Sequence, residues 1–237
     1  MARKWYTSKV IRKEQEAPNT FRFWLDYPDD EDFKFTAGQF ITCDLPIGEK
    51  RLDKWRSYSI ANIPSKQEGI ELCIVLLEGG RASGYFKNLS IGEEITFKGP
   101  EGQFVIPSNN QHELVFICTG TGIAPFRSMI LDQIQRNDHQ KMTLIFGTRS
   151  IDGMLYHEEM SRLAISKEWF NYKVALSRAS FNGYQGYVHE LYQDIAINDQ
   201  SCHFYICGWS QMVDNAKDLL LNTYHVDASR VHYELYG

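Results

Sequence analysis

Apolar and polar residues alternate along the first part of the chain, up to about Pro107. The clearest alternating runs are residues 20–25, 40–45 and 71–76. A period of two is typical of strands that turn one face toward a core. Glycine and proline interrupt these runs, as they do in the tight turns between antiparallel strands. The pattern predicts an antiparallel β-barrel or sandwich, with one short helix near residues 83–89.

A different pattern begins after about Gln111. Short, almost wholly apolar runs predict strands buried on both faces, at residues 114–118, 142–146, 172–176 and 203–207. Amphipathic segments of helix length separate them, at residues 123–136, 156–165 and 211–222. Strands that alternate with helices predict a parallel sheet wrapped by helices, as in a Rossmann-like domain. The polar segment 108–112 separates the two patterns, so we predict two domains, residues 1–107 and 112–237.

The composition is that of an ordinary globular protein, with 43% hydrophobic and 23% charged residues among 237. The 25 Lys and Arg residues and 30 Asp and Glu residues give a net charge of −5, which argues against binding to nucleic acid or to an anionic membrane. The chain contains no apolar run of the about 18–20 residues that a membrane span requires, and no apolar signal segment follows Met1. These features predict a cytoplasmic protein.

The cysteines are odd in number and form no CxxC pair. There are 5 of them, Cys43, Cys73, Cys118, Cys202 and Cys207. This usage argues for reduced thiols in the cytosol. Structural zinc sites and iron–sulfur clusters need closely spaced thiolates, so we predict that the chain holds no metal.

A glycine-rich segment follows the first apolar run of the second part. In an open parallel sheet, ligands bind beyond the carboxyl ends of the strands, and this segment, Thr119-Gly120-Thr121-Gly122-Ile123-Ala124-Pro125, lies there. Glycines let the backbone approach a phosphate closely, and the start of the next helix offers free N–H groups. The segment is a candidate pyrophosphate site, although two glycines between a strand and a helix also occur as plain packing.

Two arginines follow the next two predicted strands at the same edge. Arg149 comes after the second apolar run, and Ser177-Arg178 comes after the third. The planar guanidinium group donates two hydrogen bonds at once to a phosphate. Either arginine alone is typical of a solvated surface, but the two together favour binding of the 2′-phosphate of NADPH. Asp152 leaves the choice open, because NADH enzymes more often place an acidic residue near that ribose.

The first part contains two segments with similar chemistry. Arg56-Ser57-Tyr58-Ser59 opens a predicted strand, where a tyrosine can stack on a ring, an arginine can clamp a phosphate and a serine can hydrogen-bond a heteroatom. Gly79-Gly80-Arg81-Ala82-Ser83 precedes the predicted helix and is a second candidate phosphate site. Each segment also has a structural interpretation, as a half-exposed strand and as a glycine turn with a serine N-cap.

In this order, the segments resemble the ferredoxin–NADP reductase superfamily, in which a flavin-binding barrel precedes a nicotinamide-nucleotide domain. Residues 56–59 are similar to the Arg-x-Tyr-Ser flavin motif of that family, residues 80–83 to its Gly-x-x-Ser phosphate turn, and residues 120–125 to its nucleotide loop. Cys207-Gly208 and Glu234-Leu235-Tyr236 also have counterparts there. The resemblance extends over the whole chain and implies an antiparallel flavin-binding β-barrel followed by a Rossmann-like parallel-sheet domain.

The resemblance also implies roles for individual residues. Tyr58 is expected to stack on the isoalloxazine ring, with Ser59 at its hydride-accepting edge and Arg56 on the flavin phosphate. Cys207 and Glu234 are expected near the nicotinamide, so the catalytic candidates are Ser59, Cys207 and Glu234. The implied cofactor-binding residues are Arg56, Ser57, Tyr58, Ser59, Cys73, Ile74, Val75, Gly80, Arg81, Ala82, Ser83, Thr119, Gly120, Thr121, Gly122, Pro125, Arg149, Ser177, Arg178 and Tyr236, the last as a cover for the second flavin face.

The function that the resemblance implies is hydride transfer between NADPH and bound FAD, with single electrons passed to a carrier protein such as ferredoxin or flavodoxin. FAD is favoured over FMN because the turn at residues 80–83 supplies a place for a second phosphate. One alternative is the reductase component of an oxygenase, or a free-flavin reductase, that uses NAD(P)H. The other is a nucleotide-sensing module that binds the cofactor and transfers nothing.

Overall fold

The computed structural model describes residues 4–65, 67–108, 110–137, 140–180, 183–198 and 201–236. The chain divides into two compact units. The first comprises Met1–Ile106 together with Arg127–Asp132, and the second comprises Pro107–Phe126 together with Gln133–Gly237. Each unit has its own sheet and its own core, so each is described by itself.

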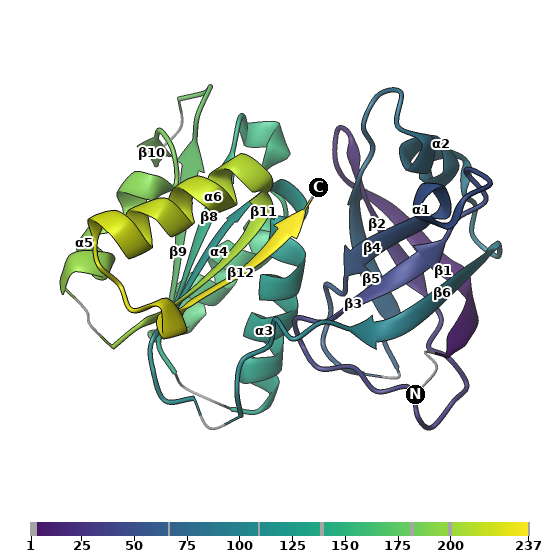
Figure 1. Ribbon diagram of the computed structural model, residues 1–237, viewed down its shortest axis with the longest axis horizontal. Helices are drawn as coiled ribbons and strands as arrows, with labels where there is room; N and C mark the ends of the chain where they lie inside the picture. The colour runs from purple at the N-terminus through teal and green to yellow at the C-terminus, as the bar shows by residue number, and fades with distance from the viewer. Residues whose placement is uncertain are drawn as a thin grey trace. The chain divides into compact units, whose positions relative to one another are not determined.

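The first unit is built on a 6-stranded antiparallel sheet with the order β4-β3-β6-β1-β2-β5 (Figure 1). Its strands are β1 Trp5–Ala17, β2 Thr20–Leu25, β3 Phe40–Asp44, β4 Trp55–Ser59, β5 Ile70–Val75 and β6 Glu94–Glu101. Two helices, α1 Arg51–Lys54 and α2 Arg81–Asn88, complete it. A bridge between Ile60 and Leu72 links the ends of the outer strands β4 and β5, so the sheet curls into a barrel-like form. The predicted antiparallel architecture is confirmed.

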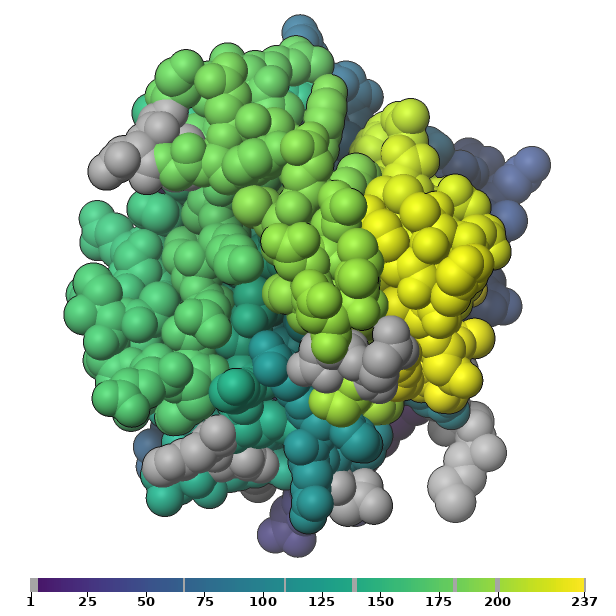
Figure 2. Space-filling view, turned by 90° about the vertical axis from the view of Figure 1, so that its left-hand side faces the viewer, coloured from purple at the N-terminus to yellow at the C-terminus, as the bar shows by residue number. Residues whose placement is uncertain are grey.

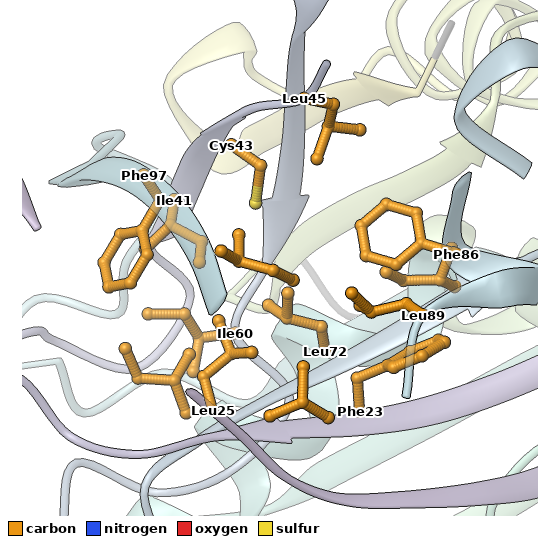
Figure 3. Close-up of a cluster of buried hydrophobic side chains, with 14 of the residues drawn as sticks. Phe23, Leu25, Ile41, Cys43, Leu45, Ile60, Leu72, Phe86, Leu89 and Phe97 are labelled. Carbon is orange, nitrogen blue, oxygen red and sulfur yellow. The ribbon is translucent and has the colours of Figure 1, made fainter. Parts of the chain in front are cut away.

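Alternating side chains of these strands form the core of the first unit (Figure 3). Phe23 and Leu25 project from β2, Ile41 and Cys43 from β3, and each is fully or almost fully buried. Phe86 of α2 closes the same cluster and lies 5.2 Å from Phe23 between ring centroids. Burial raises the pKa of the Cys43 thiol, so this cysteine behaves as a small apolar core residue.

The second unit is a 6-stranded parallel sheet with the order β10-β9-β8-β7-β11-β12. Its strands are β7 Leu114–Thr119, β8 Met142–Thr148, β9 Phe170–Leu176, β10 Tyr184–Gln185, β11 His203–Trp209 and β12 Val231–Tyr236. The helices are α3 Ile123–Gln135, whose middle segment Arg127–Asp132 belongs to the first unit, α4 His157–Ser166, α5 His189–Asn198 and α6 Ser210–Asp218. Short 3-10 helices η1 Gly120–Gly122, η2 Ile151–Gly153 and η4 Ala228–Arg230, and the π-helix η3 Leu219–Thr223, complete the unit. The predicted parallel α/β architecture is confirmed.

Helices cover both faces of the parallel sheet. Helices α5 and α6 lie side by side over one face, and Figure 2 shows their outer surface in light green and yellow. Tyr192 of α5 and Val213 of α6 are fully buried against Ile117 and Ile206 of the sheet. On the opposite face, the ring of Phe126 in α3 stacks on Phe116, with centroids 4.9 Å apart. The strands between the two layers therefore consist almost entirely of apolar residues, as the sequence pattern predicted.

Several elements differ from the predicted set. Strand β1 begins at Trp5 and runs for 13 residues, although its sequence is rich in charge. It pairs with both β2 and β6, and much of it is exposed, so few apolar residues are needed to hold it in place. Helix α5 and the edge strand β12 were also not predicted. Strand β12 lies at the edge of the sheet, where a weaker apolar pattern suffices, and the buried residues of α5 are Tyr192 and Ala196.

Three histidines stack at the amino ends of β7, β11 and β12. The ring centroids of His112 and His203 are 4.8 Å apart, and those of His203 and His232 are 5.4 Å apart. His203 Nδ1 lies 3.1 Å from His232 Nε2, so a single proton joins the two rings. Burial lowers the pKa of both, and the neighbouring His112 and Arg230 lower that of His203 further. The acidic group near Arg230 is Asp227.

We expect the melting temperature of the protein to fall as the pH drops below 6.5, the ordinary pKa of histidine. Because the pKa values of His203 and His232 are lower in the folded state, the unfolded state binds more protons in the window just below 6.5, and stability rises with pH there. His203→Gln is expected to flatten this dependence, and His225→Asn, at an exposed site, is the control. Calorimetry at about pH 5.5 and about pH 7.5 measures the difference. Equal slopes in the wild type and His203→Gln would contradict the expectation.

Candidate functional site

The motif residues of β4 alternate between two faces of the sheet. Arg56 and Tyr58 lie opposite buried core residues of β3 in the antiparallel register. Ser57 lies opposite Thr42 on the other face, where the two hydroxyl oxygens are 3.0 Å apart. The regular alternation thus places Arg56 and Tyr58 together and turns the Ser57 side chain away from them.

Tyr58 offers a ring that is held in place by its neighbours. It packs edge-on against Phe86 of α2, with centroids 5.3 Å apart and planes at 83°. Burial raises the pKa of the phenol, so Tyr58 is neutral in the physiological range. Ser59, at the end of the same strand, is 4% exposed. A neutral, half-buried aromatic beside a buried serine is suited to stacking on a flat heterocycle and hydrogen-bonding its edge.

Arg56 is oriented by backbone carbonyls at the end of α1. Its Nη1 donates to the carbonyl oxygens of Leu52 at 3.2 Å and Trp55 at 2.7 Å. A guanidinium group has five N–H donors in a planar fork, so these bonds fix its orientation and leave further donors for an anion. The position fits the phosphate-binding role that the resemblance implies.

The turn before α2 is arranged as a cradle. Ser83 Oγ accepts a hydrogen bond from the Leu77 N–H at 2.8 Å, so the hydroxyl proton of Ser83 can be donated to another group. A Cβ at Gly80 would lie 2.8 Å from that same oxygen, and only glycine leaves the space beside it open. Within the described chain no side chain caps the start of α2, so its first N–H groups face outward. This arrangement fits a phosphate.

The remaining predicted residues of the first unit have other partners. Arg81 pairs with Asp53 of α1 at 2.8 Å and donates to the Ile47 carbonyl at 3.2 Å, and Ala82 packs against the core. Cys73, Ile74 and Val75 lie on β5, the last strand in the sheet order. Their backbone pairs with β2 in the antiparallel ladder, from Thr20 opposite Val75 to Arg22 opposite Cys73.

In the second unit, the glycine loop forms η1 between β7 and α3. Gly120 has a positive φ of 53°, and a Cβ there would meet open space. A Cβ at Gly122, in contrast, would lie less than 3.0 Å from the backbone of Cys207 and Gly208. Gly122 therefore packs the loop against β11, and Gly120 gives the backbone its left-handed turn beside an open space. The open space beside Gly120, at the turn that leads into α3, fits a pyrophosphate.

Cys207, Glu234 and Tyr236 come together at the carboxyl ends of β11 and β12. Cys207 lies opposite Glu234 in the parallel register, and the Tyr236 side chain hydrogen-bonds the thiol. Burial, reinforced by Glu234, raises the pKa of Cys207 well above its ordinary value. The thiol is therefore protonated and is not a nucleophile. Neighbouring Thr119 accepts a hydrogen bond from the Trp209 N–H at 3.3 Å, which links the loop to β11.

The two predicted arginines are also neighbours. The Arg178 N–H donates to the Arg149 carbonyl at 3.0 Å, and the Ser177 N–H donates to that of Thr148 at 3.0 Å. Both arginine side chains are exposed. Asp152 is engaged by the Ser150 hydroxyl. Because β8 and β9 are adjacent strands, their carboxyl ends bring the two arginines to the same edge of the sheet.

The comparisons with known proteins agree on one family. Residues 7–106 match the oxidoreductase FAD-binding domain and residues 116–218 match the oxidoreductase NAD-binding domain. The chain is 32% identical to ferredoxin–NADP reductase B of Sorangium cellulosum, over 98% of this chain and 97% of that protein. It is 34% identical to the reductase component of phenol 2-monooxygenase from a Pseudomonas species, over 81% of this chain and 55% of that protein.

Solved structures agree with this result. A ferredoxin NADP⁺ reductase from Neisseria gonorrhoeae, with bound FAD and NADP, has a TM-score of 0.83 and 25% identity, over 98% of each chain. The fold and the two domain matches define a flavin-dependent NAD(P)H oxidoreductase with FAD as its flavin. The chain belongs to the ferredoxin–NADP reductase superfamily, as its sequence motifs predicted.

Replacement of Tyr58 by alanine is expected to weaken FAD binding by about tenfold, because the variant loses the ring on which the flavin would stack. Tyr58→Phe keeps the ring and is the matched control, with affinity close to that of the wild type. Titration of the flavin-free protein with FAD, followed by quenching of FAD fluorescence, measures both constants. Full flavin occupancy in Tyr58→Ala would show that the ring is not the stacking platform.

Proposed function

We propose that this chain is an NADPH-dependent reductase with bound FAD, which passes single electrons to a small acidic carrier protein. The assignment of NADPH rests on one observation, the pairing of Arg149 and Arg178 at adjacent strand ends beyond the sheet. Two exposed guanidinium groups at adjacent strand ends suit a doubly charged phosphate better than a neutral ribose hydroxyl. In this proposal residues 1–107 bind FAD, and residues 112–237 bind the nicotinamide nucleotide.

In this mechanism the residues of the chain bind the two cofactors and orient them. When bound, FAD accepts a hydride and can release electrons one at a time. Tyr58 would present its ring to the flavin, and Ser59 would donate a hydrogen bond from a buried position. The Cys207 thiol, kept protonated by burial and held by Tyr236, would shape the wall against which the nicotinamide lies. No side chain is required to exchange a proton in the hydride step.

The acceptor is proposed from the surface around α1. Lys50, Arg51 and Lys54 are close to Leu52 in the sequence, with Asp53 as the one acidic residue among them, and Leu52 is 88% exposed. This segment leads directly into β4, which carries Arg56 and Tyr58. On a chain of net charge −5, an exposed leucine rimmed by cations is complementary to an acidic protein surface. The relative from Sorangium is named as a ferredoxin–NADP reductase, which supports a carrier of the ferredoxin kind.

Two measurements test the proposed function. Addition of NADPH to the FAD-loaded protein without oxygen is expected to bleach the flavin absorbance, and a nucleotide-sensing module would leave it unchanged. Stopped-flow reoxidation of the reduced protein with ferredoxin, flavodoxin or free FAD then compares the acceptors. We expect faster reaction with a carrier protein than with free FAD, and with a rate that falls as salt is added.

The second candidate is the reductase component of an oxygenase. It is supported by the identity to the phenol 2-monooxygenase reductase component, although the chain spans 55% of that protein. Equal rates with all three acceptors would favour this candidate or a free-flavin reductase.

The location is proposed to be cytoplasmic. All 5 cysteines are free thiols, as expected in a reducing compartment. No helix in the described part of the chain is long and apolar enough to span a membrane.

A further inference from the structure

A buried ion pair lies on the sheet face of the first unit that is turned away from Tyr58. Lys98 Nζ donates to Glu101 Oε1 at 2.9 Å, and the two side chains are 8% and 9% exposed. Residues three apart in a regular strand point to opposite faces. Here β6 has an extra residue, because Phe40 pairs with Glu101 whereas Thr42 pairs with Lys98. This bulge turns both charged side chains to the same face.

The ion pair is linked to β4 by a chain of hydrogen bonds. The Thr42 hydroxyl donates to Glu101 Oε2 at 2.8 Å, and it lies 3.0 Å from the Ser57 hydroxyl. A hydroxyl carries one proton, and that of Thr42 is given to the carboxylate. Ser57 must therefore be the donor to Thr42. The bonds run in one direction, from Ser57 through Thr42 to Glu101, and Lys98 balances the charge at the end.

A second attachment lies two residues before Ser57. Lys98 Nζ is 4.6 Å from the ring centroid of Trp55, and the guanidinium carbon of Arg51 is 4.0 Å from that centroid. Both contacts are cation–π interactions. Strand β4 is thus attached at Trp55 and at Ser57, on the face opposite Arg56.

These attachments matter because β4 is the first strand in the sheet order, and within the named strands of the described chain its ladder is made with β3 alone. Beyond this ladder, the backbone links that the described residues make on the other side of β4 lie past its end, at the bridge between Ile60 and Leu72, so few backbone bonds fix the twist of the strand itself. Buried ion pairs contribute little net stability, since the cost of removing the charges from water offsets their attraction. The arrangement is better suited to fixing the orientation of a strand than to stabilising the fold.

We propose that Thr42 and Glu101 are positioning residues for the flavin site. Thr42 hydrogen-bonds Ser57 on the sheet face opposite Arg56 and Tyr58, and Glu101 accepts the hydrogen bond of Thr42. In this way they set the rotation of β4 and therefore the direction in which Tyr58 and Arg56 project. Neither residue touches the flavin in this proposal. The inference rests on FAD binding to the first unit, and it adds two residues that none of the sequence motifs contains.

The test is the Thr42→Val substitution in the full-length chain. Valine has the shape of threonine and leaves the Lys98–Glu101 pair in place, but it breaks the link to Ser57. The dissociation constant of FAD is expected to rise about fivefold, the effect of losing an orienting hydrogen bond, and the visible circular dichroism of the bound flavin is expected to change. Thr42→Ser keeps the hydroxyl and is expected to restore both.

Thr7→Val is the matched control. Thr7 and Thr96 form a similar hydroxyl pair, 3.2 Å apart, between strands of the same sheet, and the register places neither residue on β4. Thermal unfolding of the flavin-free proteins separates positioning from stability. The proposal is overturned if Thr42→Val binds FAD within about twofold of Thr7→Val, or if Thr42→Ser fails to rescue it. A wild-type chain that takes up no FAD would instead overturn the proposed function. Should Thr42→Val not fold, Ser57→Ala removes the same hydrogen bond between Ser57 and Thr42, and it does so at an exposed position.

Discussion

Replacement of Glu71 by glutamine is expected to lower the free energy of unfolding of the first unit by about 3–5 kcal/mol. Glu71 is 2% exposed and receives two charged donors, Arg22 Nε at 2.6 Å and Arg127 Nη1 at 2.8 Å. Arg127 belongs to the short segment Arg127–Asp132 of the same unit and is itself 9% exposed. Glutamine keeps the shape but removes the charge, so Arg127 and Arg22 lose a buried carboxylate, although Arg22 keeps its ion pair with Glu16 at 3.4 Å.

The measurement is urea unfolding followed by hydrogen exchange in peptides from β2 and β5, which report on the first unit separately. The control is Asp53→Asn, which breaks the exposed pair with Arg81, where the side chains are 56% and 36% exposed for Arg81 and Asp53. Exposed pairs contribute at most about 1 kcal/mol, so the control should change little. Similar losses in the two variants would mean that the burial of Glu71 does not determine its contribution.

The double substitution Arg149→Ala and Arg178→Ala is expected to reduce the ratio of kcat/KM for NADPH to kcat/KM for NADH by about a hundredfold or more. Each charge-assisted hydrogen bond to a phosphate contributes about 1.5–3 kcal/mol, and only NADPH carries the 2′-phosphate. The rate with NADH should therefore remain close to that of the wild type.

Steady-state rates with a chemical one-electron acceptor give kcat/KM for NADPH and for NADH in each variant, and no carrier protein is needed. Arg162→Ala, at an exposed position of α4, is the control for a general loss of positive charge. A double variant that keeps the wild-type ratio would show that the arginines do not select the coenzyme. In that case Asp152, which follows the same strand end, becomes the residue to examine for NADH.

The hydrophobic pattern of the sequence predicts a strand or helix reliably where the whole segment is buried to the same degree. The mostly apolar run 203–207 predicted β11, because a short run of this kind is typical of a strand that is buried on both faces. Strand β1 could not be predicted in this way. It is held by two neighbours along its length, and its exposed charged residues hide the alternation.

In the candidate site, too, some features could be predicted from the sequence and others could not. Arg149 and Arg178 were expected at one edge because both follow strands, and the adjacency of β8 and β9 then brings them together. The link from Ser57 to Glu101 was not predictable, because it joins three strands and depends on the bulge in β6. Gly99 and Pro100, which stand directly before Glu101, are the sequence signal of that bulge, but glycine and proline in such a place equally predict a turn.

The burial of every cysteine has a practical consequence. Cys43 and Cys73 lie in the first unit, and Cys118, Cys202 and Cys207 lie in the second. A thiol reagent can reach any of them only when the surrounding structure opens, so the rate of labelling at each position follows that local event. Mass spectrometry of alkylated peptides would then follow the opening of each unit in the native enzyme, with no engineered probe.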